Sequence, residues 1–202
     1  MRVRTDARRN AILDVATEVF RETGYANASM AMISARIGGS KGTLYGYFKS
    51  KEELFATVMM ATMEEQAEKT IALLDVSEPD VGLALRTFGN ALLAMLTAPD
   101  TISMLRAAIA EGGNSRLGAI LYQLGAEGGW DAMSQYIARL QETGVLRPAD
   151  PRVAAAHLKG LLETGFIEPL LYGAQPWFVA EEAVAAAVEA FLRAYRCAGG
   201  EQ

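Results

Sequence analysis

A short run of side chains around residue 45 has the types and spacing needed to bind the edge of a nucleic-acid duplex. Lysine pairs with phosphate or guanine, threonine can meet a base edge, and tyrosine hydroxyls can donate to phosphate oxygens. Residues 41–47 supply all three types, together with Gly42, which lets the backbone come close to another surface. The spacing alone is equally compatible with a helical hairpin whose glycines only allow tight packing.

Two short helices joined by a glycine turn position these side chains. Ser29 is a suitable N-cap for the first helix, which we expect to end at Gly38, because glycine takes positive φ without a Cβ clash. Ser40 caps the second helix, and Leu44 with Phe48 can anchor it at i, i+4 spacing. If this pair binds a duplex, the residues predicted to contact DNA are Ser29, Met30, Ser40, Lys41, Gly42, Thr43, Tyr45, Tyr47 and Lys51.

One longer helix precedes this pair and another follows it. Apolar residues recur at helical spacing over residues 7–23, so three helices can share one small core. Ser50 and Glu53 form a capping box, in which Glu53 accepts from the backbone N–H of Ser50, at the start of a helix predicted to reach about Leu74. Lys51 lies at that N-terminus, where the helix dipole adds to its charge, which predicts a phosphate-holding site.

Charge is distributed unevenly along the 202 residues. Residues 1–51 hold nine Lys and Arg against four Asp and Glu, which gives +5. The rest of the chain holds ten against twenty, which gives −10, within a total of −5. A basic segment on an acidic body is expected of a protein that binds a polyanion with one end.

Common catalytic and membrane-spanning patterns are missing from the sequence. One histidine and one cysteine, Cys197, exclude a His-rich metal site and make a Cys–His pair implausible. There is no G-x-S-x-G, P-loop or dinucleotide fingerprint, so we expect no enzyme, catalytic residue, metal or cofactor. Uncharged runs reach at most 13 residues and the N-terminus has no apolar signal core, so we expect a cytoplasmic protein without a membrane partner.

Residues 7–54 resemble the DNA-binding segment of the tetracycline-repressor-like (TetR) family. The matching residues are Ser29, Ile33-Ser34, Ile37-Gly38-Gly39-Ser40, Gly42-Thr43-Leu44-Tyr45, Tyr47-Phe48 and Ser50-Lys51-Glu52-Glu53-Leu54. The departures are Ser34 and Ile37, where the family usually has Ala, and Gly39, where it prefers Val, so that the turn lacks an apolar plug. Residues 102–162 resemble, more loosely, the C-terminal domain of the AefR-like branch.

The remainder of the chain also has helical patterns, which predicts an all-α protein with about nine or ten helices. Beyond the long helix, we expect helices near residues 80–97, 100–111, 115–125, 130–143, 151–172 and 177–197, with Pro169 kinking or shortening the fifth of these. Adaptable apolar residues that could line a ligand pocket, with plain core as the alternative, are Met63, Phe88, Met104, Tyr122, Trp130, Met133 and Phe166. Candidates for a dimer interface, with intrachain core as the alternative, are Leu158, Leu161, Val184, Val188, Phe191 and Tyr195.

The resemblance implies a transcriptional regulator with a helix-turn-helix domain over residues 1–50 and an effector-binding and dimerisation domain over residues 51–202. Its expected partners are a double-stranded, pseudo-palindromic DNA operator, a largely apolar small-molecule effector that releases the repressor, and a second copy of the chain. The alternative is a helical ligand-binding or adaptor protein of the same fold that does not bind DNA.

Overall fold

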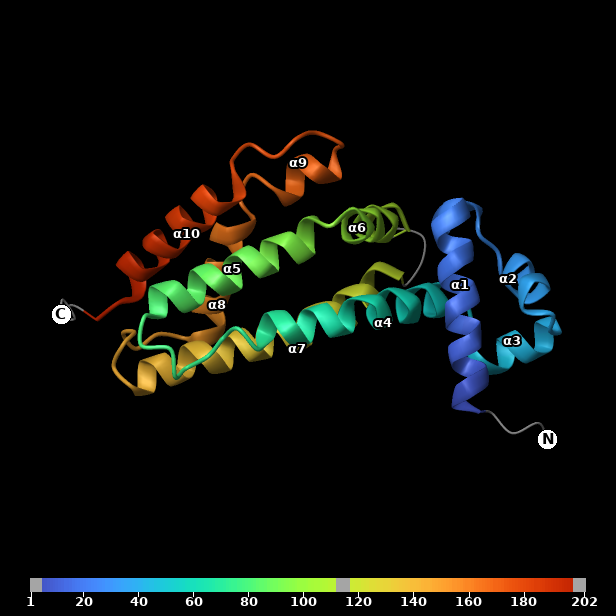
Figure 1. The fold of residues 1–202 in the computed structure, drawn as a ribbon, viewed down its shortest axis with the longest axis horizontal. Coiled ribbons are helices and arrows are strands. Elements are labelled where there is room, and N and C mark those ends of the chain that lie inside the picture. The colour runs from blue at the N-terminus through green and yellow to red at the C-terminus, as the bar shows by residue number, and fades with distance from the viewer. Residues whose placement is uncertain (1–4, 112–116, 198–202) are drawn as a thin grey trace. The chain divides into compact units, whose positions relative to one another are not determined.

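The described part of the chain is built from α-helices (Figure 1). The computed structural model describes residues 5–111 and 117–197, without the side chains of residues 62, 65, 111, 117, 118 and 120–128. The helices are α1 (Asp6–Asn27), α2 (Met30–Ile37), α3 (Lys41–Tyr47), α4 (Lys51–Ile71), α5 (Val81–Thr97), α6 (Pro99–Glu111), α7 (Leu117–Glu142), α8 (Pro151–Glu163), α9 (Ile167–Leu171) and α10 (Ala180–Tyr195). The β-pairing found in these ranges is one isolated antiparallel bridge, between Leu146 and Arg196. The predicted all-α class is confirmed.

Contacts between Cα atoms divide the chain into two compact units. The first comprises Met1–Glu64 and Arg106–Leu124, and the second comprises Glu65–Leu105 and Gly125–Gln202. The helices α4, α6 and α7 therefore contribute residues to both units. These contacts assign the first turns of α4 to the unit that holds α1 to α3, whereas the functional division predicted at residue 50 assigns them to the body.

In the first unit, α1, α2, α3 and the start of α4 share one apolar core. Ile12 and Ile33 are only 1% and 0% exposed. The Phe55 ring of α4 packs on two aromatic rings of α1, with ring centroids 4.9 Å apart for Phe20 and 4.6 Å apart for Tyr25. Each of these helices has one apolar stripe and buries it against the others, which is why short segments are stable here.

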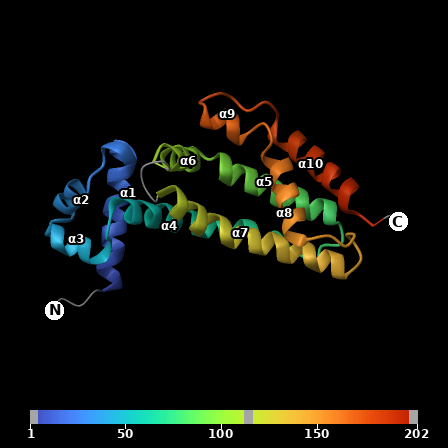
Figure 2. The same ribbon diagram turned by 180° about the vertical axis from the view of Figure 1, so that it is seen from behind.

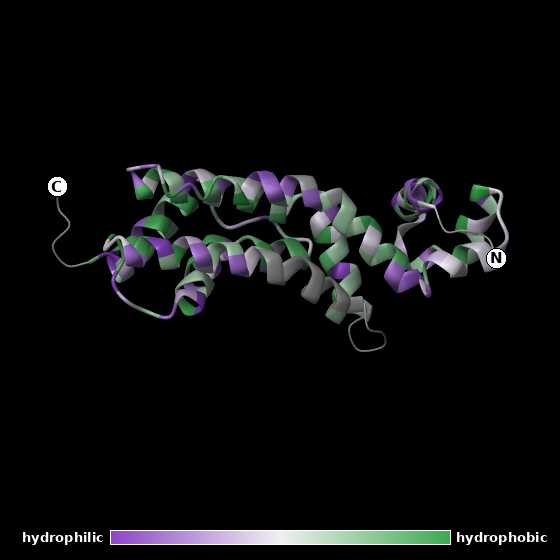
Figure 3. Ribbon diagram, turned by 90° about the horizontal axis from the view of Figure 1, so that it is seen from below, coloured by the Kyte–Doolittle hydropathy of each residue, from purple (hydrophilic) through white to green (hydrophobic). Residues whose placement is uncertain are grey.

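In the second unit, α5 and α10 pack side by side, and α8 packs against both (Figures 1 and 2). Gly89 allows the close approach of α5, because a Cβ atom there would lie 2.8 Å from Leu162 and 2.9 Å from Val184. Leu85 and Phe191 are fully buried in the same core. Figure 3 shows hydrophilic and hydrophobic bands alternating along the helices, as expected of helices that bury one face.

Two predicted helix breaks are misplaced. The break expected at residues 125–129 is wrong, because α7 continues through these residues. The glycines there suggested a break, but a glycine inside a helix costs only about 1 kcal/mol and does not by itself end the helix. Gly144, with φ of 75°, follows the end of α7. The helix predicted over residues 151–172 is divided at Gly165, where φ is 81°. Pro169, expected to kink or shorten it, instead lies in the first turn of α9, where its missing N–H is not needed.

Other helix limits differ from the predictions by a few residues. The long helix ends at Ile71 rather than Leu74, and the last helix begins at Ala180 rather than at residue 177. None of the described helices alone combines the length and apolar content of a membrane span; α5 and α6 reach both only as a pair, bent by 60° at their junction.

Candidate nucleic-acid interface and ligand cavity

Hydrogen bonds at both ends define α2. The Ser29 hydroxyl accepts from the backbone N–H of Met32 at 3.2 Å, so the predicted N-cap is confirmed. The helix ends at Gly38, whose φ of 69° lies in the left-handed region that glycine tolerates. The buried Ser34 hydroxyl donates to the Gly39 carbonyl oxygen at 2.9 Å, which fixes the turn that follows.

The short helix α3 is capped at its start and anchored on one face. The Ser40 hydroxyl accepts from the Thr43 backbone N–H at 3.2 Å. Leu44 and Phe48 are each 2% exposed. The Arg9 guanidinium lies 5.5 Å from the centroid of the Phe48 ring, as a cation–π partner. Because the anchors occupy one side of this short helix, the opposite side is left to solvent.

The outer side of α3 presents the residues that the sequence predicted for DNA contact. Ser40, Lys41, Gly42 and Tyr45 are exposed, and Tyr45 exposes 49% of its surface. Thr43 is partly exposed, and its hydroxyl lies 3.0 Å from that of Ser40. An ammonium group, two hydroxyls and a phenol therefore share one accessible surface.

Three further residues predicted for DNA contact have internal roles. The Met30 side chain is 7% exposed and packs in the core, so only its backbone could reach a duplex, which corrects the predicted side-chain contact. The Ser29 hydroxyl is used in the cap of α2. The Tyr47 hydroxyl accepts from the Thr5 backbone N–H at 3.1 Å, which links the end of α3 to the start of α1.

Lys51 has a different role from the predicted one. Its ammonium donates to the Tyr25 carbonyl oxygen at 2.9 Å and to the Ala28 carbonyl oxygen at 3.2 Å. It also lies 4.1 Å from the centroid of the Tyr25 ring. The charge is thus directed at the C-terminal end of α1, where carbonyl oxygens lack helical partners, rather than toward a phosphate. The phosphate-holding prediction for Lys51 does not fit this geometry.

The capping box before α4 is formed with one altered partner. The Ser50 hydroxyl accepts from the Glu53 backbone N–H at 3.1 Å, as predicted. The Glu53 carboxylate, however, accepts from the backbone N–H of Lys49 at 2.8 Å, instead of that of Ser50. In the same turn, hydrogen bonds from its own backbone N–H and then from Ser50 hold the pKa of the Glu52 carboxyl below its ordinary value of 4.5.

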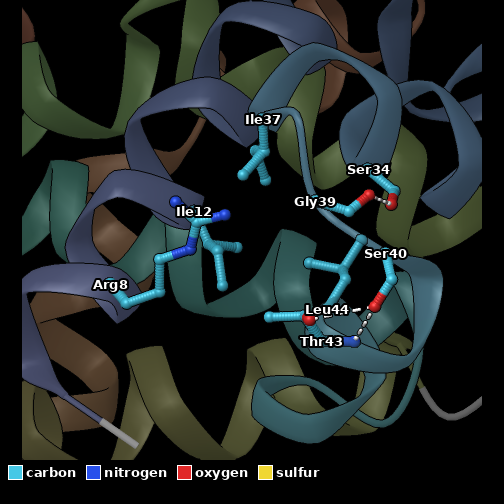
Figure 4. Close-up of a pocket in the computed structure, with 8 residues that line it drawn as sticks. All are labelled: Arg8, Ile12, Ser34, Ile37, Gly39, Ser40, Thr43 and Leu44. Atoms are coloured by element: carbon cyan, nitrogen blue, oxygen red, sulfur yellow. Dashed lines mark hydrogen bonds between the residues drawn. The ribbon is translucent and has the colours of Figure 1, made fainter.

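Arg8 is a residue that the sequence did not single out. Its side chain runs from α1 toward the turn between α2 and α3 and lines a small pocket with Ile37 and Gly39 (Figure 4). A Cβ atom on Gly39 would lie 3.1 Å from the Arg8 guanidinium. Arg8 therefore reaches the space that a larger turn residue would take, and places a positive charge beside the turn. The sequence feature that could have pointed to a packing neighbour is Gly39, because the space that a glycine leaves in a turn must be filled by another side chain.

An ion pair joins the outer surfaces of α1 and α2. The Arg36 guanidinium donates to the Glu22 carboxylate at 2.6 Å. This hydrogen bond holds the pKa of Glu22 below its ordinary value and raises that of Arg36. The Arg36 side chain of α2 is thus paired within the protein. On α3, the basic residue is Lys41, which is exposed.

Two family models cover most of the chain. Residues 12–58 match the model for bacterial regulatory proteins of the tetR family, and residues 83–197 match the C-terminal domain of AefR-like transcriptional repressors. The chain belongs to the TetR family of transcriptional regulators. Both predicted resemblances are confirmed, and the second covers more of the chain than residues 102–162.

Individual relatives and solved structures match over most of their length. The HTH-type transcriptional regulator YhgD of Bacillus subtilis is 27% identical over 152 residues, which are 73% of this chain and 76% of YhgD. The crystal structure of a TetR-family regulator from Mesorhizobium loti has a TM-score of 0.82 and 26% identity, covering 96% of this chain and 100% of that one. The flavonoid-responsive regulator FrrA has a TM-score of 0.75 and 26% identity, covering 95% and 98%. Regulators of this family bind DNA operators and small-molecule effectors, typically as dimers.

The second unit of this TetR-family chain contains a cavity of about 120 Å³. Its described lining comes from α4, α5, α7 and α8: Ala67, Thr70, Ile71, Phe88, Leu92, Met95, Leu96, Gly129, Trp130, Met133 and Lys159. Three predicted ligand residues, Phe88, Trp130 and Met133, are among them.

The other predicted ligand residues lie elsewhere. Met104 and Phe166 are buried but do not line this cavity. Met63 belongs to the first unit. The side chain of Tyr122 lies outside the described residues. Residue type alone does not separate these four positions from the three that line the cavity, because core and cavity walls use the same residue types.

The residues predicted for the dimer interface are mostly core within one subunit. Leu158, Val184, Val188, Phe191 and Tyr195 are at most 5% exposed, which corrects their assignment to an interface. Leu161 alone of the six is exposed, at 40%. The exposed residues of the same two helices are Arg152, Val153, Ala156, His157, Gly160 and Leu161 on α8, and Ala180, Glu181, Glu182, Ala185, Ala186, Glu189, Ala190, Arg193 and Ala194 on α10.

Proposed function

We propose that this TetR-family chain is a repressor that binds a pseudo-palindromic DNA operator in the cytoplasm as a dimer and leaves it when a small, largely apolar effector binds. One observation carries the proposal: Leu44 and Phe48 bury one side of α3 while Lys41 and Tyr45 face solvent on the other. A short, rigidly anchored helix with a polar outer side is the kind of element that the major groove admits.

The exposed groups of α3 divide into two kinds of contact. Lys41 and the Tyr45 hydroxyl are suited to phosphate oxygens, which fix the register of the protein on DNA. The Thr43 side chain, with its methyl and hydroxyl groups, is suited to a base edge or a thymine methyl group. Gly42 lets the backbone come close to the duplex. Arg8 adds a positive charge beside the turn between α2 and α3.

A dimer presents two such helices to one operator. Half-sites one helical turn apart, about 34–36 Å, require two reading helices related by a two-fold axis. We assign the interface to the exposed sides of α8 and α10, which are rich in alanine and include Leu161. Small residues allow helices to approach closely, and two helices from each subunit form a four-helix bundle.

An effector in the cavity has a direct route to the DNA-binding unit through α4. The end of this helix lines the cavity with Ala67, Thr70 and Ile71, while its start packs Leu54 and Phe55 into the core beneath α1. The effector must bind the conformation that cannot hold DNA more tightly than the one that can. To shift the ratio of these two conformations from 1:99 to 99:1, its affinity for them must differ by about 10⁴-fold. The flavonoid-responsive FrrA, a structural relative, supports an apolar small molecule in this role.

Selection of duplexes from a random DNA pool by the full-length chain tests the proposal. We expect enrichment of a pseudo-palindrome, measured afterwards by fluorescence anisotropy with increasing salt. Lys41→Met and Tyr45→Phe should weaken binding, because each removes one phosphate contact per subunit. Arg139→Met, at an exposed position of α7 in the second unit, is the matched control and should bind as the wild type does.

Enrichment of no duplex by a folded, dimeric chain would overturn the proposal. That result would favour the alternative, a helical ligand-binding or adaptor protein of this fold without DNA binding. The sequence feature that favours this alternative is Gly39, because the TetR family prefers valine at that position of the turn. The approach of Arg8 to Gly39 weakens it, because the turn has a neighbour that packs on it.

A further inference from the structure

The cavity of the second unit has mostly apolar walls and, among its described lining residues, one charged side chain. Phe88, Met133 and Trp130 are among the apolar lining residues. The Thr70 hydroxyl already donates to the Gln66 carbonyl oxygen at 2.8 Å. Among the described lining residues, Lys159 is the one that carries a charge. A pocket of this kind orients its ligand through its few polar groups.

Lys159 is held by interactions that a ligand can replace. Its ammonium pairs with Glu163, one turn further along α8, and lies 5.5 Å from the centroid of the Trp130 ring. The two paired side chains are 31% and 22% exposed. Ion pairs at i, i+4 on a helix contribute little to stability where solvent reaches them. A second carboxylate can therefore take the place of Glu163 at small cost.

We propose that the cavity binds an amphipathic carboxylate, with its apolar body inside and its carboxylate accepting from Lys159. This inference rests on the proposed function, because it names the chemical class of the effector. A cavity of about 150 Å³ in another protein binds benzene. The cavity of about 120 Å³ here suits a body of one aromatic ring or a short hydrocarbon chain.

Charge distinguishes the carboxylate from other amphiphiles of the same size. A carboxylate forms a charge-assisted hydrogen bond with Lys159, and such bonds are about twice as strong as neutral ones. In a hydrogen bond between Lys159 and an alcohol, only Lys159 is charged, so this bond is weaker than the one with a carboxylate. An amine would be repelled by Lys159 and would find that ammonium already above the Trp130 ring.

Titration with three probes of one shape tests the inference. The probes are 3-phenylpropionate, 3-phenylpropanol and 3-phenylpropylamine at neutral pH, added to the full chain without DNA. The chain has two tryptophans, and Trp177 is 67% exposed, so a Trp177→Phe background leaves Trp130 to report binding by fluorescence. We expect the acid to bind at least about tenfold more tightly than the alcohol, and the amine to bind most weakly.

Variants of the ion pair separate charge recognition from packing. Lys159→Met should weaken the acid about tenfold and the alcohol much less, because the alcohol loses only the weaker hydrogen bond and the apolar stem is retained. Lys159→Arg should keep the preference for the acid. Glu163→Gln should strengthen acid binding, since it removes the competing carboxylate. Arg86→Met breaks an exposed ion pair of the same unit, the one with Asp80 at 3.7 Å, and should change nothing. Thermal melting of each variant confirms that it is folded.

Equal affinities for the three probes, tighter binding of the amine, or binding of none would each overturn the inference. The same outcomes leave the proposed function intact if the chain still enriches an operator duplex. Conversely, acid binding through Lys159 by a chain that enriches no duplex would support the ligand class and overturn the repressor.

Discussion

Replacing Lys51 with methionine removes an ammonium group but keeps most of the side-chain length. The lost interactions are hydrogen bonds to the Tyr25 and Ala28 carbonyl oxygens, at 2.9 and 3.2 Å, and a cation–π contact at 4.1 Å from the Tyr25 ring. A hydrogen bond to a charged group contributes about 1.5–3 kcal/mol, and a partly exposed cation–π contact about 0.5–1 kcal/mol. Because Lys51 is only half-buried, water can replace the longer of its two hydrogen bonds. We therefore count one hydrogen bond and the cation–π contact at their lower values and expect a loss of about 2 kcal/mol.

Thermal unfolding followed by circular dichroism measures this loss. For a chain of this length, about 1 kcal/mol shifts Tm by roughly 2–4 °C, so Lys51→Met should melt about 4–8 °C below the wild type. The matched control is Lys41→Met, at an exposed position that begins α3. It should change the free energy of unfolding by no more than about 0.5 kcal/mol.

DNA binding should separate the same two variants in the opposite direction. Lys41→Met should weaken operator binding and lower the slope of log K against log salt by about one per subunit. Lys51→Met, at a temperature where it is folded, should keep the wild-type slope. Wild-type stability of Lys51→Met together with a reduced salt slope would refute the reasoning and restore the role of Lys51 as a phosphate contact.

Two further predictions concern the core of the second unit. Gly89→Ala places a Cβ atom 2.8 Å from Leu162 and 2.9 Å from Val184, and should lower the free energy of unfolding by about 1–3 kcal/mol. Gly129→Ala, on α7, with no atom within 4 Å of the added Cβ, should raise it by about 0.5–1 kcal/mol. Urea denaturation compares the two variants, and equal effects would contradict the packing argument. Tyr136→Phe should be neutral or stabilising, because the buried hydroxyl has no hydrogen-bond partner among the described residues, and a loss above about 1 kcal/mol would show that it does.

The local geometry of the helix-turn-helix was predictable because its determinants are close in sequence. Ser29 and Ser40 cap helices through N–H groups three residues away, and Gly38 ends α2 by its own conformation. The anchors Leu44 and Phe48 are one helical turn apart, so their common side follows from the helix period. The side of α3 opposite these two anchors could then be predicted to face solvent.

What could not be predicted depends on long-range packing. Lys51 finds its partner Tyr25 across 26 residues, and Arg8 reaches Gly39 from another helix. Met30 looked exposed as the first residue of a short helix, but tertiary contacts bury it. Such contacts join segments whose relative placement has no signature in local spacing.

The body of the chain shows the same limit for apolar patterns. A stripe such as Val184, Val188 and Phe191 must be buried, but periodicity does not say whether the partner is in the same subunit. Here the partners are α5 and α8 of the same chain. The cavity raises the same ambiguity, because Met133 lines it while Met104, equally apolar, does not.

The most direct test of the central claim, that the outer side of α3 binds DNA, is the salt dependence of binding to the selected duplex. Anisotropy titrations of the wild type and Lys41→Met between about 50 and 200 mM salt should give straight lines of log K against log salt. The wild type should lose several orders of magnitude in affinity, and Lys41→Met should give the shallower line. Identical slopes for the two proteins, or an affinity that salt does not change, would contradict the account.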